Sequence, residues 1–153
     1  MKSRTVTKTS VFPAAKEVVF SRLKELKTLQ YIATPFATFT PVNSAENLIW
    51  EKNRDFAFRF KLFSILPLGI HTIHVVEFDE LSCEIYTNER NPYVPVWNHR
   101  INLKETGTGK TQYTDEVEIY AGWKTPFVYL WAKRFYAHRQ RKWLKLLQYD
   151  TEQ

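Results

Sequence analysis

The sequence has few cysteines and no long apolar run, and each shortage excludes a class of protein. Its 153 residues include one cysteine, Cys83, which excludes an internal disulfide and a cysteine-based zinc site. The longest unbroken apolar stretch, residues 127–132, is far shorter than the roughly 20 residues that span a bilayer. The first ten residues, MKSRTVTKTS, lack the apolar segment of a signal peptide. We therefore expect a cytoplasmic protein without integral membrane association.

The chain also lacks internal repeats, low-complexity segments and any linker-like stretch between domains. A chain of this length buries roughly two thirds of its unfolded surface, which is enough for one hydrophobic core. We predict a single domain that spans residues 1–153.

The formal net charge is +6, and much of the positive excess lies near the C-terminus. One interpretation is a solvated basic helix face, and the other is a surface for nucleic acid or an anionic membrane. Aromatic residues make up 16% of the chain and are spread along it, which is more typical of a lined interior than of a base-stacking platform.

Residues 123–147 predict one long C-terminal helix, because Thr125 can cap it, Pro126 suits its first turn and no later proline or glycine interrupts it. At 100° per residue, one broad apolar stripe contains Val128, Trp131, Ala132, Phe135, Trp143 and Leu146. Lys133, Arg134, Gln140, Arg141 and Lys145 lie largely on the other side. Arg139 falls within the apolar stripe, where a charge is costly without a polar partner.

The N-terminal third predicts one strand followed by two helices. Residues 3–11 are rich in Thr and Val and predict a strand. Residues 13–26 have apolar residues at helical spacing, and a second short helix is expected at residues 28–33, where Pro35 ends it.

The middle of the chain, residues 36–121, predicts about six strands, at residues 37–42, 55–63, 70–78, 83–89, 96–105 and 110–121. Turn signals separate them at residues 43–47, 64–69, 79–82, 90–95 and 106–109. In residues 55–63, Phe56, Phe58, Phe60 and Leu62 alternate with polar residues, so one face of the sheet is dry. Short connections favour antiparallel pairing, so we expect an α+β fold with a curved antiparallel sheet.

This order of elements resembles the helix-grip fold of the START-like (SRPBCC) superfamily. Residues 9–20 resemble its first strand and helix, residues 60–80 its central hairpin, and residues 99–122 its last hairpin. The greatest similarity is to uncharacterised bacterial polyketide cyclase and dehydratase-like proteins. The resemblance implies about seven strands wrapped around the long C-terminal helix, with two short helices after the first strand and a pocket, often large and apolar, between sheet and helix.

The last predicted hairpin places two ionisable residues on its apolar face. His99 alternates with Trp97, Ile101 and Leu103, and Asp115 alternates with Tyr113, Val117 and Ile119. If the turn closes symmetrically, His99 and Asp115 lie opposite or one diagonal apart, within hydrogen-bond reach. Together with Arg139 they would form a polar cluster. One interpretation is a structural network that fixes the helix on the sheet, and the other is a site that orients a ligand's carboxylate, hydroxyl or keto oxygen.

Three further residues are candidates for the pocket or for a metal. His71 and His74 lie three apart on one strand, so they point to opposite faces and cannot share a metal ion. His74 has the parity of Val76 and Phe78 and can face the pocket, although a single inward histidine is more often a satisfied core residue. Glu89 has the parity of Ile85 and Thr87 and can also point inward, although a glutamate at a strand end is usually solvated.

We therefore expect a protein that binds a hydrophobic small molecule or lipid-like ligand, without a cofactor, a metal or DNA. The expected ligand-binding residues are Phe58, Phe60, His74, Trp97, His99, Tyr113, Asp115, Trp131, Phe135 and Arg139. The loops at residues 64–69 and 91–96 carry apolar residues and are expected either to form the lips of the pocket or to pack on the first helices, and their exposure would also allow a homodimer.

Two alternatives belong to other classes of protein. The first is a cyclase or dehydratase-like enzyme that uses His99 and Asp115 as catalytic acid and base. The second is a nucleic-acid or anionic-surface binder that uses the basic face of the C-terminal helix, including Arg134, Arg141 and Lys145.

Overall fold

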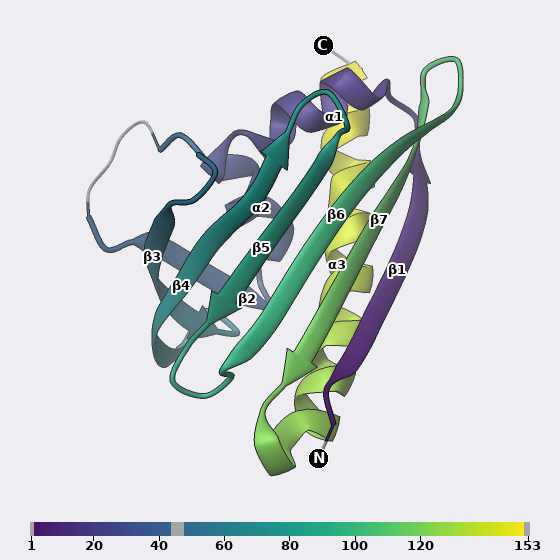
Figure 1. The fold of residues 1–153 in the computed structure, drawn as a ribbon. Coiled ribbons are helices and arrows are strands. Elements are labelled where there is room, and N and C mark those ends of the chain that lie inside the picture. Colours follow the sequence, from purple (N-terminus) through teal and green to yellow (C-terminus); the bar gives the residue numbers. More distant parts are fainter. Residues whose placement is uncertain (1, 44–47, 152–153) are drawn as a thin grey trace.

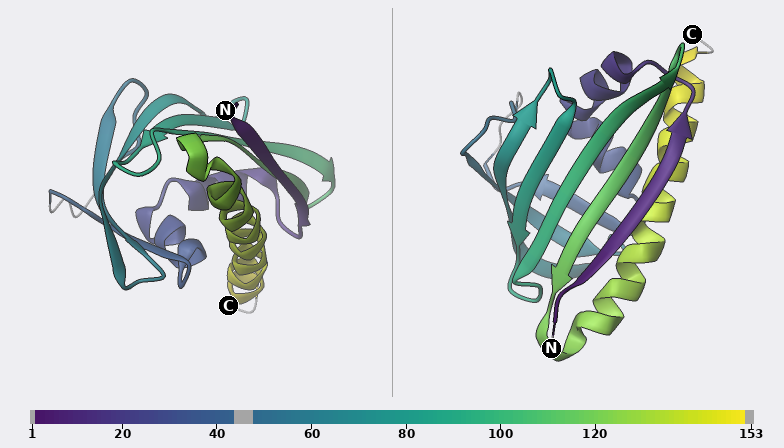
Figure 2. Two further views of the ribbon diagram at one scale, coloured as in Figure 1. Left: turned by 90° about the horizontal axis from the view of Figure 1, so that it is seen from below. Right: turned by 45° about the vertical axis from the view of Figure 1, so that its right-hand side comes forward.

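A computed structural model describes residues 2–43 and 48–151 and shows a curved antiparallel sheet with a long helix lying along its concave side (Figures 1 and 2). The seven strands are β1 (Arg4–Phe12), β2 (Ala37–Pro41), β3 (Asp55–Leu62), β4 (Leu66–Asp79), β5 (Glu84–Arg90), β6 (Val96–Gly107) and β7 (Lys110–Tyr120). The predicted seven-stranded α+β architecture is confirmed. The turn expected at residues 43–47 lies largely outside the described residues.

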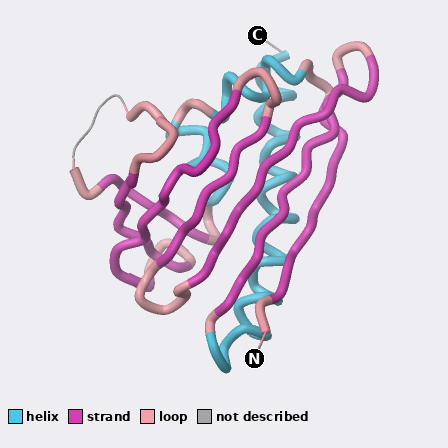
Figure 3. The backbone as a smooth tube through the Cα atoms, viewed as in Figure 1, coloured by secondary structure: helices cyan, strands magenta, loops and turns pink. Residues whose placement is uncertain are grey.

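The strands are arranged in the order β1-β7-β6-β5-β4-β3-β2, so the first two strands of the chain occupy opposite edges of the sheet. The helices α1 (Lys16–Leu23) and α2 (Leu26–Ala33) carry the chain from one edge of the sheet to the other. Figure 3 shows them behind the sheet, on the same side as the long C-terminal helix. β2 pairs antiparallel with β3 across a longer connection, and from β3 onward short turns join neighbouring antiparallel strands.

The C-terminal helix α3 (Thr125–Thr151) follows a short 3-10 turn, η1 (Gly122–Lys124). The Thr125 hydroxyl donates to the carbonyl of Gly122 over 2.7 Å and accepts the backbone N–H of Ala121 over 2.9 Å, so it stabilises the turn that starts the helix. Pro126 is the second helical residue, where a missing N–H has no cost. The helix predicted at residues 123–147 is confirmed, and it continues to Thr151.

An irregularity in β4 changes which of its side chains face inward. Val75 pairs with Thr87 and Glu77 pairs with Tyr86, so Val76 is an extra residue without a partner on β5. Such a bulge reverses the alternation of side chains, since residues on either side of it are one position out of step. The buried face of β4 therefore contains His71 and Val75 before the bulge, and Phe78 after it.

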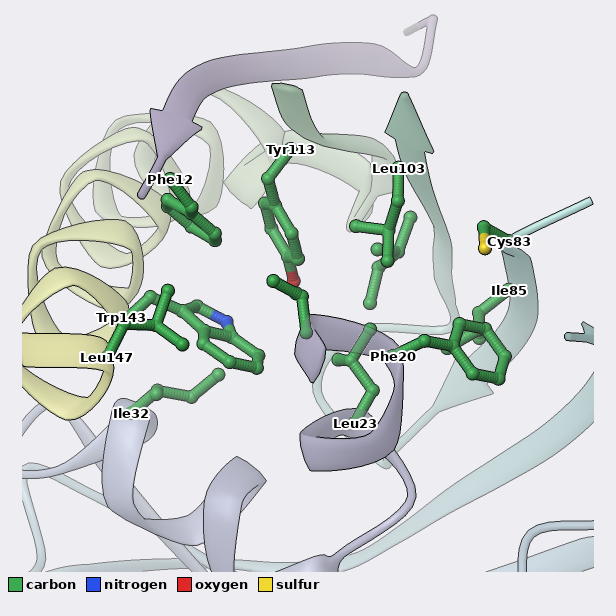
Figure 4. Packing of buried hydrophobic residues seen from close by; sticks show 12 residues of the cluster. Phe12, Phe20, Leu23, Ile32, Cys83, Ile85, Leu103, Tyr113, Trp143 and Leu147 are labelled. Atoms are coloured by element: carbon green, nitrogen blue, oxygen red, sulfur yellow. The ribbon is translucent and has the colours of Figure 1, made fainter. Parts of the chain in front are cut away.

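The core at one end of the molecule is filled by aromatic and aliphatic side chains from the sheet, α1, α2 and α3 (Figure 4). Tyr113 stacks on Phe12 with ring centroids 4.8 Å apart, and its ring lies 5.7 Å from that of Trp143. Cys83 belongs to the same cluster and is buried. This packing holds the C-terminal half of α3 against the sheet. Within the described ranges, no helix is both long and apolar enough to cross a bilayer.

Candidate functional site

The central feature is a cavity of about 640 Å³ between the concave face of the sheet, α2 and the N-terminal half of α3. Its wall is mainly apolar, with aliphatic residues such as Ile73, Val75 and Ile101 on the strands and Trp131 and Phe135 on α3. Because a folded interior is normally close-packed, a void of this size has lost the side-chain contacts that would stabilise a filled core. It falls in the usual range of small-molecule sites, about 300–1,000 Å³.

Exposed aromatic residues lie at one end of this cavity. Trp123, Phe127 and Tyr93 belong to its wall, yet they are 74%, 67% and 50% exposed. They come from η1, α3 and the loop between β5 and β6, which meet at the lower end of the molecule in Figure 1. The Lys124 ammonium donates to the carbonyl of Tyr93 over 3.0 Å and joins two of these segments. We call Tyr93, Trp123 and Phe127 the mouth of the cavity.

His99 and Asp115 form the predicted hydrogen bond. The two residues are one diagonal apart in the β6–β7 ladder, because His99 pairs with Val117 and Asp115 pairs with Ile101. The His99 Nε2 atom lies 2.7 Å from Asp115 Oδ1, and both residues are buried. His99 lies on the cavity wall with Asp115 behind it. Since an ionised carboxylate can only accept, His99 carries a proton on Nε2.

The second oxygen of Asp115 is bound by Gln140 of α3. The Gln140 Nε2 atom donates to Asp115 Oδ2 over 3.0 Å and to the carbonyl of Lys8 over 2.8 Å. The Ser10 hydroxyl donates to the Gln140 Oε1 atom over 2.5 Å, which fixes the orientation of the amide. Gln140 is only 1% exposed, although the helical pattern assigns it to the polar side. The assignment is wrong because α3 also packs against β1, so a second side of the helix is buried.

Glu89 forms a second buried polar group beside His99. Its Oε1 atom lies 2.8 Å from His71 Nε2, and its Oε2 atom accepts the Thr87 hydroxyl over 2.6 Å. The His99 Nδ1 atom lies 3.9 Å from Glu89 Oε2, which is too far for a hydrogen bond. All four of these residues line the cavity, and Asp115 lies behind His99, so one carboxylate is on the wall of the polar end and a second is just beneath it.

The protonation state of His71 follows from its other neighbour, Asn91. The Asn91 Oδ1 atom accepts the backbone N–H groups of Tyr93 and Val94, each over 2.9 Å. Its Nδ2 atom must then be the group that lies 3.1 Å from His71 Nδ1, where it donates. His71 Nδ1 is therefore an acceptor, and the proton of a neutral His71 lies on Nε2, facing Glu89.

Both carboxyl groups are held in the ionised form. Burial raises the pKa of Asp115, but the hydrogen bond and charge of His99, with the charge of Arg139, outweigh it and lower the pKa below its usual value. Burial likewise raises the pKa of Glu89, and the hydrogen bond from His71 with the nearby His99 outweighs it. The site therefore contains two buried negative charges.

Arg139 lies on the cavity wall and extends from α3 over the rings of Phe135 and Tyr136, at 5.6 and 5.2 Å from their centroids. Burial lowers its pKa, but the charge of Asp115 and other neighbours outweighs this and raises it, so the guanidinium stays charged. Its Nε atom is enclosed without an acceptor, and no carboxylate of the described residues lies within ion-pair distance. Asp115, which was expected to pair with this arginine, is therefore near enough to affect its pKa but is not in contact with it.

Of the ten residues expected to bind a ligand, six lie on the cavity wall: Phe60, Trp97, His99, Trp131, Phe135 and Arg139. Phe58 faces inward but is covered by Phe39 and Trp50, whose rings lie 5.4 and 6.0 Å from its own. Tyr113 is packed into the core of Figure 4, and Asp115 lies behind His99. Parity places these three on the correct face, but it contains no information about the depth of a side chain beneath the wall.

His74 is wrongly assigned to the pocket. It lies on the outer face of β4, where its Nδ1 atom is 2.6 Å from Asp55 Oδ1 and its side chain is 37% exposed. The bulge at Val76 is the reason, because counting back from Phe78 across it assigns the wrong face. His71 is the histidine of this strand that lines the cavity.

The ligand-binding residues expected from the sequence do not include His71, Glu89 or Gln140. The parity of Glu89 with Ile85 and Thr87 was a usable signal, since all three face inward. His71 reaches Glu89 only because the register of β4 and β5 pairs Ile73 with Glu89, which places His71 one diagonal away. Nothing local distinguishes Gln140 from a solvated helix residue.

Solved structures of low sequence identity share the whole fold. A START superfamily protein from Mycobacterium smegmatis has a TM-score of 0.71 and 13% identity, with 94% of this chain and 97% of that chain covered. A protein from Thermus thermophilus has a TM-score of 0.72 and 10% identity over 96% and 99% of the two chains. The Zhui aromatase/cyclase from a Streptomyces species has a TM-score of 0.65 and 12% identity over 98% and 94%.

These matches confirm the predicted START-like, helix-grip fold. A comparison with curated proteins found no match. A family model matches residues 10–147, and the chain belongs to that family, which is described as a domain of unknown function, DUF8410.

Proposed function

We propose that residues 1–153 form one ligand-binding domain, which takes a hydrophobic small molecule or lipid-like ligand into the cavity. The observation that supports this most directly is the cavity itself, about 640 Å³ of largely apolar space with a polar group at one end. An apolar ligand would regain the dispersion contacts and the burial that an empty void lacks. The mouth gives such a ligand a way in.

A neutral apolar dye tests this proposal. N-phenyl-1-naphthylamine gains fluorescence in an apolar site, and we expect saturable binding to the purified protein. Ile73 lines the cavity, so Ile73→Trp reduces the cavity volume and should weaken binding. Ile70 is 47% exposed and is not part of the cavity wall, so Ile70→Trp adds the same volume outside it and should bind normally. Absence of dye binding, or equal binding by both variants, would contradict the proposal. Native mass spectrometry of the purified protein would reveal a ligand retained from the cell.

A catalytic role is a second candidate, and the bond between His99 and Asp115 favours it. A carboxylate that holds one imidazole nitrogen leaves the other free to take or give a proton. The His99 Nδ1 atom has no hydrogen-bond partner among the described residues, and His99 lines the cavity. On a polyketide-like substrate this histidine would remove a proton from a carbon between two carbonyl groups.

The reaction is testable with a synthetic poly-β-ketone thioester, whose cyclised aromatic product absorbs in the near ultraviolet. We expect the protein to accelerate cyclisation and His99→Ala to lose about 10²-fold or more of that acceleration. His74→Ala, outside the cavity, is the matched control. If His99→Ala cyclises the substrate as fast as the wild type, His99 has no catalytic role.

A third candidate is an anionic surface on the basic side of α3. Arg134, Arg141 and Lys145 are exposed and spaced seven and four residues apart, so they share one side of the helix. None of them forms an ion pair with another residue that the structure describes. Binding to anionic vesicles or to DNA should then fall steeply with salt and be lost when all three are changed to Gln. Binding that is unaffected by the triple change would exclude this surface.

A further inference from the structure

Arg139 lies on the cavity wall and is partly exposed there, and no carboxylate of the described residues lies within ion-pair distance of its guanidinium. Donors of a folded interior are almost always satisfied, so a guanidinium that borders a cavity needs an acceptor from water or from a ligand. The enclosed Nε atom cannot meet such an acceptor, which leaves the terminal nitrogens of the guanidinium.

The carboxylates of the site are already fully engaged by other groups. His99 and Gln140 donate to the two oxygens of Asp115, over 2.7 and 3.0 Å. His71 and Thr87 approach the two oxygens of Glu89, over 2.8 and 2.6 Å. Each of the four oxygens thus has its own donor. Neither carboxylate depends on Arg139 for a donor, and the terminal N–H groups of its guanidinium are left for the cavity.

The charge of the cluster indicates which acceptor fits. Asp115 and Glu89 contribute two negative charges, and Arg139 contributes one positive charge. His71 is neutral because Asn91 donates to its Nδ1 atom. The cluster is therefore neutral when His99 is doubly protonated and has a charge of minus one when it is not. A ligand carboxylate would add a further negative charge in either case, beside two carboxylates that are already buried.

We propose that the polar part of the ligand is an uncharged oxygen acceptor, such as a keto, ester or amide carbonyl, which Arg139 binds, and that a carboxylate is disfavoured. This inference rests on the proposed ligand-binding function and specifies its chemical class. The carbonyl accepts from the guanidinium without changing the charge of the cluster.

The test uses three probes with the same chain: methyl dodecanoate, dodecanoate and dodecane. Each competes with N-phenyl-1-naphthylamine at pH 8, where the free acid is ionised. We expect the ester to bind at least about tenfold more tightly than dodecane and than dodecanoate, since a hydrogen bond to a charged donor is worth about a factor of ten or more. Arg139→Met should bring the ester within about threefold of dodecane. Arg134→Met, on the exposed side of the same helix, should leave the ranking unchanged.

The outcomes separate the inference from the function on which it rests. If dodecanoate binds more tightly than the ester, or if ester and dodecane bind equally while the dye still binds, the inference is wrong and the cavity remains a ligand site. If neither the dye nor any probe binds, both proposals fail. The order of affinities of the three probes in the wild-type protein tests the inference even if Arg139→Met does not fold.

Discussion

The His99 Nε2 atom lies 2.7 Å from Asp115 Oδ1, and this bond joins the wall of the cavity to the layer beneath it. Asp115 has no exposed surface, and its other oxygen is bound by Gln140 of α3. One carboxylate therefore positions a residue of the cavity and also ties the helix to the sheet. A structural network and a ligand site share these atoms, so substitutions here affect both stability and binding.

Replacing Asp115 should destabilise the fold. Asp115→Asn removes a buried charge that His99 and Arg139 compensate, and it turns an amide donor toward His99 or Gln140, which themselves donate. We expect the free energy of unfolding to fall by about 3 kcal/mol, as measured by urea denaturation. Glu116→Gln, at an exposed neighbour, should change it by less than about 0.5 kcal/mol. Equal effects of the two changes would contradict the role assigned to Asp115.

Stability should fall in acid because the folded state holds two carboxylates in ionised form. The pKa values of Asp115 and Glu89 are lower in the folded protein than their usual values, so their contribution is fully present above the unfolded pKa, about 4. It is lost as the pH falls below that value through the lower folded pKa. Urea denaturation between pH 2 and 7 should show this loss as a free energy of unfolding that falls with pH below about 4.

Glu89→Gln should make the acid dependence shallower, because a glutamine at this position binds no proton. Glu105→Gln, on the exposed part of β6, serves as the control and should keep the slope of the wild type. A Glu89→Gln variant with an unchanged slope would show that Glu89 does not contribute to it.

The two histidines of β4 should differ in their contribution to stability. His71→Ala leaves the Glu89 Oε1 atom and the Asn91 Nδ2 atom without their partner, and we expect a loss of about 1–3 kcal/mol. His74→Ala breaks only a partly exposed pair with Asp55 and should cost less than about 1 kcal/mol. Thermal or urea denaturation of both variants measures the difference. A larger loss from His74→Ala would reverse the assignment of the two faces.

The mouth should control exchange of a ligand more than stability. Trp123→Ala and Phe127→Ala remove exposed rings, so the free energy of unfolding should change by less than about 0.5 kcal/mol. Dissociation of N-phenyl-1-naphthylamine, followed by stopped-flow fluorescence, should become several-fold faster because less aromatic surface covers the opening. Leu81→Ala, at a 93% exposed residue in the turn between β4 and β5, is the control. Unchanged dissociation in all three variants would place the entrance elsewhere.

The sequence by itself determined the order of the elements, the dry face of the sheet and the inward positions of His99, Asp115 and Arg139. These follow from local rules, because alternation along a strand and the helical period require only neighbouring residues. They identified the face of the sheet on which the cavity lies, but not which of its side chains reach the cavity.

Only the tertiary structure decided the remaining features. The bulge at Val76 exchanged the roles of His74 and His71, and it exists only in the pairing of β4 with β5. Phe58 is covered by Phe39 and Trp50, Tyr113 is covered by Phe12, and Gln140 is buried by β1. Whether the interior is hollow depends on the summed volumes of side chains from the sheet and all three helices, which no local pattern contains.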